Sequence, residues 1–198
     1  MEPLWPYATP GIPDCLFEQL PGIPMSQREV RLMLLSALRL VPQSVLWDIG
    51  AGTGTIPVEA ALLCPKGTIV AVERDEDVAA LIQRNCQRFK VTNVDIVVGN
   101  APDCFDSLPY VPDAILIEGG RDLKPLLASA WKKLALHGRL VAIASNFKSL
   151  HSISESFSNL QVRNVEVVQT GGSRLETRGS NQVLKPIVPT FILSGEKF

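Results

Sequence analysis

Residues 45–54 constrain the fold of this chain more than any other stretch. They read Val-Leu-Trp-Asp-Ile-Gly-Ala-Gly-Thr-Gly, an apolar run followed by three glycines spaced two residues apart. Residues 56–63 are again mostly apolar, which is typical of a helix packed on a sheet. We therefore predict a buried strand, a tight glycine turn and a helix start. Glycine is needed there because the turn requires backbone angles that a Cβ forbids and leaves bare backbone for a ligand.

The spacing of the glycines narrows the class of loop. A dinucleotide fingerprint needs a glycine where this chain has Thr55, and a phosphate-binding P-loop needs a lysine that the turn lacks. The pattern that remains is acid-x-Gly-x-Gly-x-Gly, with Asp48 as the acid. The next apolar run, residues 68–72, is closed by Glu73, whose carboxylate can accept both hydroxyl protons of a ribose. Together these features resemble motif I of the S-adenosylmethionine-dependent methyltransferases; the alternative is a purely structural turn.

Composition limits the partners and the compartment. A length of 198 residues suggests one domain, and a hydrophobic fraction of 46% is enough for a real core. The net charge of −1 provides no basic field for a polyanion, so we expect no nucleic-acid partner. The four cysteines form no C-x-x-C pair, which indicates reduced thiols in a cytoplasmic protein and no metal site. No apolar run reaches the ~18–20 residues of a membrane span.

Hydrophobic periodicity predicts alternating strands and helices along the chain. We expect strands over residues 45–49, 68–72, 94–98, 114–117, 138–144, 162–169 and 187–193, and helices over residues 27–41, 56–63, 75–90, 123–134 and 148–160. This order predicts an α/β, Rossmann-like class I methyltransferase fold. Its sheet is mostly parallel and seven-stranded, with an antiparallel C-terminal edge.

The N-terminal 25 residues differ in character from the rest. They contain eight prolines and glycines but also apolar side chains such as Trp5, Ile12 and Phe17. We predict an extended arm over residues 1–25, lying on the body or against a neighbouring subunit, and a single domain over residues 26–198. Ser26 and Glu29 have the spacing of a helix capping box. The alternative is that Ser26 overhangs the glycine turn and contacts a cofactor.

Six short stretches carry a more specific resemblance. They are residues 11–14, 25–31, 47–54, 99–102, 118–120 and 172–179. Together they resemble the decarboxylating precorrin-6B C-15-methyltransferase family of cobalamin biosynthesis, known as CbiT and equivalent to the C-terminal half of the bifunctional CobL enzyme. This chain departs from the family pattern at Ser26, Gln27, Asn100 and Glu118, where threonine, lysine, aspartate and a smaller residue are common.

The resemblance implies a reaction and a set of contacts. The reaction is methyl transfer from S-adenosylmethionine to meso carbon 15 of a reduced tetrapyrrole (precorrin), with loss of carbon dioxide from the ring C acetate. The cofactor contacts would be Ser26, Gly50, Ala51, Gly52, Thr53, Gly54, Glu73 and Ala101. We add Asn100, whose amide can hydrogen-bond a base edge or serve only as a turn former. The family also implies a homo-oligomer, a tetramer, with a separate precorrin methyltransferase acting at carbon 5 as a further partner.

The implied substrate is a polycarboxylate, so arginines are expected in its pocket. Arg121 follows the fourth predicted strand, and Arg174 and Arg178 lie between the last two; the alternative is that these are solvated charges. Glu118 is a candidate for steering a proton or for repelling the acetate. We expect no metal and no nucleophilic triad.

Two other functions stay open at this point. One is a methyltransferase acting on RNA or another small metabolite. An amino-methylating enzyme often has Asn/Asp-Pro-Pro-Tyr/Phe after the fourth strand, where this chain has residues 118–121 as Glu-Gly-Gly-Arg. The other is a non-enzymatic S-adenosylmethionine-binding module, which the intact glycines and Glu73 disfavour.

Overall fold

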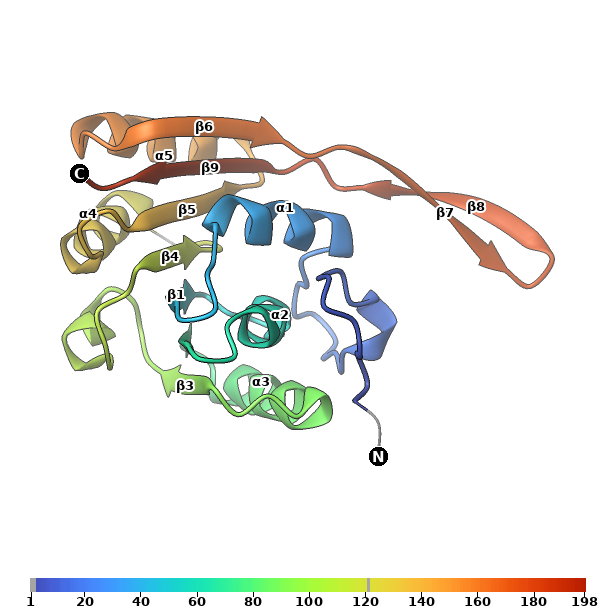
Figure 1. Ribbon diagram of the computed structural model, residues 1–198. Coiled ribbons are helices and arrows are strands. Elements are labelled where there is room, and N and C mark those ends of the chain that lie inside the picture. The colour runs from blue at the N-terminus through green and yellow to red at the C-terminus, as the bar shows by residue number, and fades with distance from the viewer. Residues whose placement is uncertain (1–2, 121) are drawn as a thin grey trace.

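A seven-stranded sheet with helices on both faces forms the body of the protein (Figure 1). The computed structural model describes residues 3–120 and 122–198. The strands are β1 (Val45–Ile49), β2 (Thr68–Glu73), β3 (Val94–Val98), β4 (Ala114–Ile117), β5 (Arg139–Ala144), β6 (Arg163–Gln169), β7 (Gly172–Arg178), β8 (Asn181–Ile187) and β9 (Phe191–Glu196). The helices are α1 (Arg28–Leu38), α2 (Thr55–Leu63), α3 (Glu76–Phe89), α4 (Leu123–Lys133) and α5 (Phe147–Asn159), with short 3₁₀ turns η1 (Asp14–Leu16) and η2 (Asp103–Ser107).

The strand order of the large sheet is β3-β2-β1-β4-β5-β9-β6. Strands β1 to β5 pair in parallel, whereas β9 runs antiparallel to both β5 and β6. The predicted fold class is confirmed. The antiparallel strand is second from the edge rather than outermost, because the chain places β6 first and returns as β9 between β6 and β5.

The two faces of the sheet are covered by different helices. Alternate residues of a strand point to opposite faces. The face that carries Trp47 and Ile115 packs against η2, α4 and α5. The face that carries Leu46 and Leu116 packs against α1 and α2. Among the described residues, none of the helices combines the length and apolar character that crossing a bilayer requires.

The predicted strand over residues 187–193 was wrong in its boundaries. Ile187 ends β8 and Phe191 begins β9, and the segment between them contains Pro189, which cannot donate to a strand ladder. Strands β7 and β8 pair only with each other and form an antiparallel hairpin that projects far from the body (Figure 1). The sequence did not predict these two strands, since their few apolar residues do not alternate regularly with polar ones and glycines flank them.

The capping box predicted at the start of α1 is also wrong. The N-cap is Gln27, and no side chain caps the helix. The Ser26 hydroxyl instead donates to the Glu118 carboxylate, at 2.8 Å, and the Glu29 carboxylate pairs with Arg174. Hydrogen bonds that involve a charged group are stronger than neutral ones, so these partners displace the cap.

The N-terminal arm is anchored in the core in its middle part. Ile12 is fully buried, and Phe17 packs on Phe89 of α3 with ring centroids 4.8 Å apart. These side chains join a cluster that includes Val58 of α2 and Ile82 of α3. The arm therefore covers the outer side of α2 and α3.

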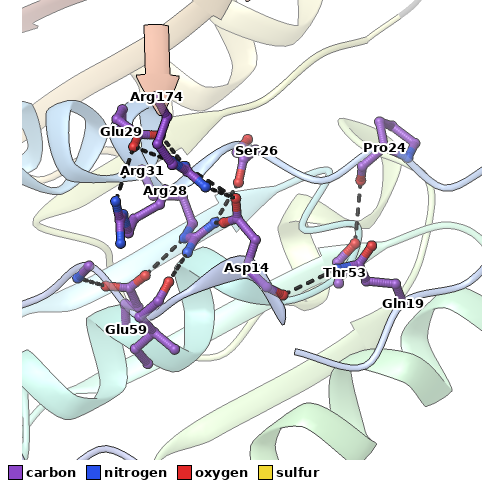
Figure 2. A network of polar contacts seen from close by, with 12 residues as sticks. Asp14, Gln19, Pro24, Ser26, Arg28, Glu29, Arg31, Thr53, Glu59 and Arg174 are labelled. Carbon is purple, nitrogen blue, oxygen red and sulfur yellow. Dashed lines mark hydrogen bonds and ion pairs between the residues drawn. The ribbon is translucent and has the colours of Figure 1, made fainter. Parts of the chain in front are cut away.

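The buried guanidinium of Arg31 fastens this arm to α1 and α2 (Figure 2). Its Nε donates to Glu59 Oε1 of α2 at 2.8 Å, and its Nη1 donates to Asp14 Oδ1 at 2.7 Å. The remaining bonds go to backbone: Nη1 to the carbonyl of Ser26 and Nη2 to the carbonyl of Ile12, each at 2.5 Å. One side chain thus connects three separate stretches of chain.

The same cluster reaches the base of the hairpin. Arg174 of β7 donates to Glu29, with Nε at 2.8 Å from Oε1, and contacts Asp14 at 3.5 Å. This pairing lowers the pKa of Glu29 to about 2, chiefly through the hydrogen bond from Arg174. The hairpin is therefore tied to α1 and to the arm by charge.

We predict that Arg31→Met lowers the free energy of unfolding by about 3–5 kcal/mol, because it leaves the Glu59 carboxylate buried without its partner. Equilibrium denaturation measures the loss. The control is the double variant Arg31→Met/Glu59→Leu, which removes both charges and should recover at least half of the loss. Equal losses in the single and double variants would contradict a charge-based clamp.

Candidate active site

The glycine turn begins where β1 ends. Gly50, Gly52 and Gly54 all have positive φ, at 83°, 52° and 80°. The N–H groups of Gly50 and Ala51 donate to the carbonyl of Val72 in β2, at 2.9 and 3.1 Å. A Cβ built on Gly50 would meet no atom within 4 Å, so the backbone here faces open space.

Gly54 has a different task within the same turn. It is the N-cap of α2, and a Cβ at this position would lie 2.9 Å from Cγ2 of Ile82. Backbone angle and close packing against α3 both exclude a side chain. Gly54 thus allows α2 and α3 to approach each other.

Glu73, at the end of β2, is oriented by backbone donors. Its Oε2 accepts from the N–H of Gly52 at 3.2 Å, and its Oε1 accepts from the N–H groups of Arg74 and Asp75 at 2.8 and 3.2 Å. A carboxylate offers about four lone-pair sites. The carboxylate is therefore held in place and still has acceptor capacity.

A cavity of about 590 Å³ lies at the carboxyl ends of the first four strands. Its lining includes Gly50, Glu73, Asn100, Ala101, Gly120 and Leu126. The volume is in the range typical of small-molecule sites. The Asn100 amide donates to Asp103 of its own turn at 2.9 Å, which leaves its carbonyl oxygen available.

A second cavity of about 280 Å³ adjoins the first at Gly50, which lines both. Its lining includes Ser26, Ala51, Gly52, Thr53 and Glu118, together with the apolar side chains of Val30, Ile143 and Val188. The segment over the turn is held down by Thr53, whose hydroxyl donates to the Pro24 carbonyl at 3.3 Å (Figure 2). The two cavities therefore share Gly50 as a common wall, and we treat them together as the candidate site.

The predicted residues divide between these cavities and other places. Every predicted cofactor residue except Gly54 lines one cavity or both, and Glu118 lines the smaller one. Arg174 lines neither, since Glu29 and Asp14 hold it. Arg121 and the side chain of Arg178 lie outside the described residues.

Burial and hydrogen bonding act against each other at Glu118. Burial raises the pKa of this carboxyl group to about 7, although the hydrogen bond from Ser26 and the positive charge of Arg31 favour its anion. A group with such a pKa can both give and take a proton near neutral pH.

The sequence did not reveal that the carboxyl group of Asp48 is buried without a hydrogen-bond partner. Both of its carboxylate oxygens are buried and have no hydrogen-bond partner among the described residues. Burial raises its pKa well above the usual range, and the charges of Glu118 and Glu73 add to the shift. The acid of the glycine motif was the available signal, but only the fold shows that it stands unpaired. The wall formed by Ile143 and Val188 was missed because no motif marks it.

The chemistry of these residues fits S-adenosylmethionine. Glu73 can accept the hydroxyl protons of a ribose, and the open backbone at Gly50 can approach the amino-acid end. Asp48 lines neither cavity, and its buried, unpaired carboxyl group stands two residues before Gly50, so its charge acts on a bound ligand only through the electrostatic field. Within the described part of the chain, no group of His, Cys, Asp and Glu side chains could hold a metal ion.

The fold is shared with a solved S-adenosylmethionine-dependent O-methyltransferase from Thermotoga maritima. The TM-score is 0.74 over 87% of this chain and 66% of that one, and the identity of 17% supports a likeness of fold alone. With the glycine turn and Glu73 in place, the fold and site define the class of S-adenosylmethionine-dependent methyltransferases.

The particular family follows from closer relatives. Residues 20–197 match the model of the precorrin methyltransferase domain, and the chain belongs to this family. A Pyrobaculum calidifontis protein named "Probable cobalt-precorrin-6B C(15)-methyltransferase (decarboxylating)" is 38% identical over 96% of this chain and 97% of its own length. A solved precorrin-6y C5,15-methyltransferase from Geobacter metallireducens has a TM-score of 0.88 and 30% identity, covering 95% of this chain and 98% of that one.

Two glycines with nearly equal backbone angles test the role of Gly54. Gly22 has φ +81° and open space around its Cβ position, whereas Gly54 has φ +80° and contacts Ile82 there. We predict that Gly22→Ala costs about 1–2 kcal/mol from backbone strain alone. Gly54→Ala should cost about 1–3 kcal/mol more, because it overpacks the contact with α3. Chemical denaturation of both variants measures the difference, and equal costs would contradict the packing argument.

Proposed function

We propose that this chain transfers a methyl group from S-adenosylmethionine to carbon 15 of precorrin-6B, or of its cobalt form, and removes the ring C acetate carboxyl group as carbon dioxide. Membership of the precorrin methyltransferase family and the substrate named for the Pyrobaculum relative support this function. The observation that carries the proposal is the meeting of two cavities at Gly50. One contains Glu73, and the other contains Ser26 and Glu118.

We assign the larger cavity to the nucleoside of the cofactor and the turn to its amino-acid end. Glu73 would bind the ribose hydroxyls, with Asn100 and Ala101 beside the adenine. The amino-acid end would lie against Ser26 and residues 50–54. When bound, S-adenosylmethionine supplies the methyl group.

The smaller cavity would take the edge of the macrocycle that bears carbon 15 and ring C. A cavity of about 280 Å³ is far smaller than a tetrapyrrole, so most of the macrocycle would remain outside it. The apolar side chains of Ile143 and Val188 suit a conjugated ring edge. Holding the carbon in line with the methyl group is the main catalytic task, and such positioning is worth up to roughly 7–11 kcal/mol in the best model systems.

Glu118 is our candidate for moving a proton. Methyl transfer leaves a positive charge on the macrocycle, and breaking the bond to the carboxyl group returns an electron pair to it, leaving an exocyclic carbon–carbon double bond. The exocyclic carbon must then gain a proton and the macrocycle must lose one, so no net proton is consumed. Glu118 has a pKa of about 7 and accepts a hydrogen bond from Ser26 at 2.8 Å. It can therefore take the proton that the macrocycle loses and give a proton to the exocyclic carbon.

The arginine partners of the substrate carboxylates remain a proposal. Gly120 lines the larger cavity, and Arg121 is the next residue in the sequence. Arg178 belongs to the hairpin. Arg174 would first have to release Glu29. Of the three, we favour Arg121 and Arg178.

We also propose a cytoplasmic homo-oligomer, a tetramer by resemblance to the family, with carbon 5 methylated by a separate enzyme. The hairpin projects from the body (Figure 1). It supports assembly, because it exposes the apolar side chains of Leu175, Val183 and Leu184. Exposed apolar surface of this kind is typical of an interface.

The proposed reaction predicts a product of defined composition. Incubation of the protein with precorrin-6B and methyl-labelled S-adenosylmethionine should give a product with one labelled methyl group gained and one carboxyl group lost. Mass spectrometry measures both changes together. Label transfer to no tetrapyrrole, under conditions in which the substrate stays intact, would contradict the proposal.

Two substitutions separate cofactor binding from proton transfer in this assay. Glu118→Gln should lower kcat by about 10²-fold or more, a far larger effect than the several-fold change expected in the KM for S-adenosylmethionine. Glu73→Gln should instead raise that KM, because it weakens the hold on the ribose. Unimpaired turnover by Glu118→Gln would remove this residue from the chemistry.

A further inference from the structure

Three carboxyl groups share one face of the sheet at its carboxyl edge. Asp48 of β1 is in register with Ala71 of β2 and with Leu116 of β4. Glu73 and Glu118 each lie two residues further along those strands. Since alternate residues point to the same face, Asp48 lies between the other two, roughly 7–8 Å from each by backbone position.

These carboxyl groups differ in how they are satisfied. Glu73 accepts three backbone hydrogen bonds, and Glu118 accepts one from Ser26. Asp48 accepts none from the described residues and is completely buried. A buried carboxylate without a partner is strongly unfavourable, so the group takes up a proton instead. The pKa of Asp48 and that of Glu118 are both raised, chiefly by burial.

We infer that Asp48 and Glu118 together hold a proton in the cofactor-free enzyme and release it to solvent when the positively charged methyl donor enters. This inference rests on the proposed use of S-adenosylmethionine, and no bond of the cofactor changes in the step.

The direction follows from charge. S-adenosylmethionine carries one positive charge more than S-adenosylhomocysteine, at the sulfur. A nearby positive charge stabilises the ionised form of a carboxyl group and lowers its pKa. Binding of S-adenosylmethionine therefore releases more of the proton than binding of S-adenosylhomocysteine. Once the methyl group has left, the pair regains a proton and loses its attraction for the spent cofactor. The pair therefore distinguishes the donor from the product.

Other charged groups lie near this pair or line the larger cavity, and among them Arg31 pairs with Glu59 and Asp14. They are Glu73 at the end of β2, Arg31 on α1, Glu59 on α2, Asp14 in the arm, and Arg74, Asp103 and Asp122 around the larger cavity. Arg31 is held by Glu59 and Asp14, so its charge favours the Glu118 anion without pairing with it. Among the described residues, neither Asp48 nor Glu118 has a cation within ion-pair distance.

Isothermal titration calorimetry tests the inference without requiring turnover. Binding of S-adenosylmethionine at pH 7 is measured in two buffers of different ionisation enthalpy, which gives the number of protons released. We expect the wild type to release about 0.5–1 proton more than Glu118→Gln or Asp48→Asn. Any proton released by the amino group of the cofactor is released with the wild type and with each variant alike. The difference between them therefore counts the proton released by the protein. Glu155→Gln, on the exposed side of α5, should behave as the wild type.

Affinity provides a second readout. From pH 6 to pH 8, the ratio of Kd for S-adenosylhomocysteine to Kd for S-adenosylmethionine should rise about three- to tenfold in the wild type, and less in both variants. Tight binding with the same proton count in wild type and variants would overturn the inference but leave the cofactor assignment intact. Absence of binding by either ligand to the wild type would overturn both.

Discussion

The guanidinium of Arg31 is the interaction on which the rest of the structure depends. It is buried, and it connects the N-terminal arm, α1 and α2 through two carboxylates and two carbonyls. One of those carbonyls belongs to Ser26, whose hydroxyl bonds Glu118. Arg31 therefore sets the position of the segment that covers the glycine turn, and with it the distance between that segment and the end of β4.

Three carboxyl groups at the carboxyl edge of the sheet determine the electrostatics of the candidate site. Parallel strands β2, β1 and β4 bring Glu73, Asp48 and Glu118 onto one face, where Asp48 is buried and the other two line the cavities. Backbone donors hold Glu73 as an acceptor, whereas burial raises the pKa of the other two carboxyl groups. The same strands thus provide the acceptor that we propose for the ribose and the two carboxyl groups that we propose hold a proton.

Local patterns predicted much of the fold and, for every predicted cofactor residue except Gly54, a place beside one of the two cavities. The glycine turn and the alternation of strands and helices are visible in the sequence, because turn angles and sheet burial each require particular residues. Long-range pairing was not predictable. Ser26 and Glu118 lie 92 residues apart, and Glu29 meets Arg174 across 145 residues, so the capping box was an incorrect interpretation of local spacing. The β7–β8 hairpin escaped prediction because it has no buried face to impose a period.

A crystal structure of the protein with S-adenosylhomocysteine would test the proposed cofactor site. We expect ribose hydroxyls within hydrogen-bonding distance of the Glu73 carboxylate. We also expect the amino-acid end against the bare backbone of residues 50–52, with the sulfur facing the cavity that contains Glu118. A ligand bound elsewhere, or a turn closed by side chains so that no ligand enters, would contradict this assignment.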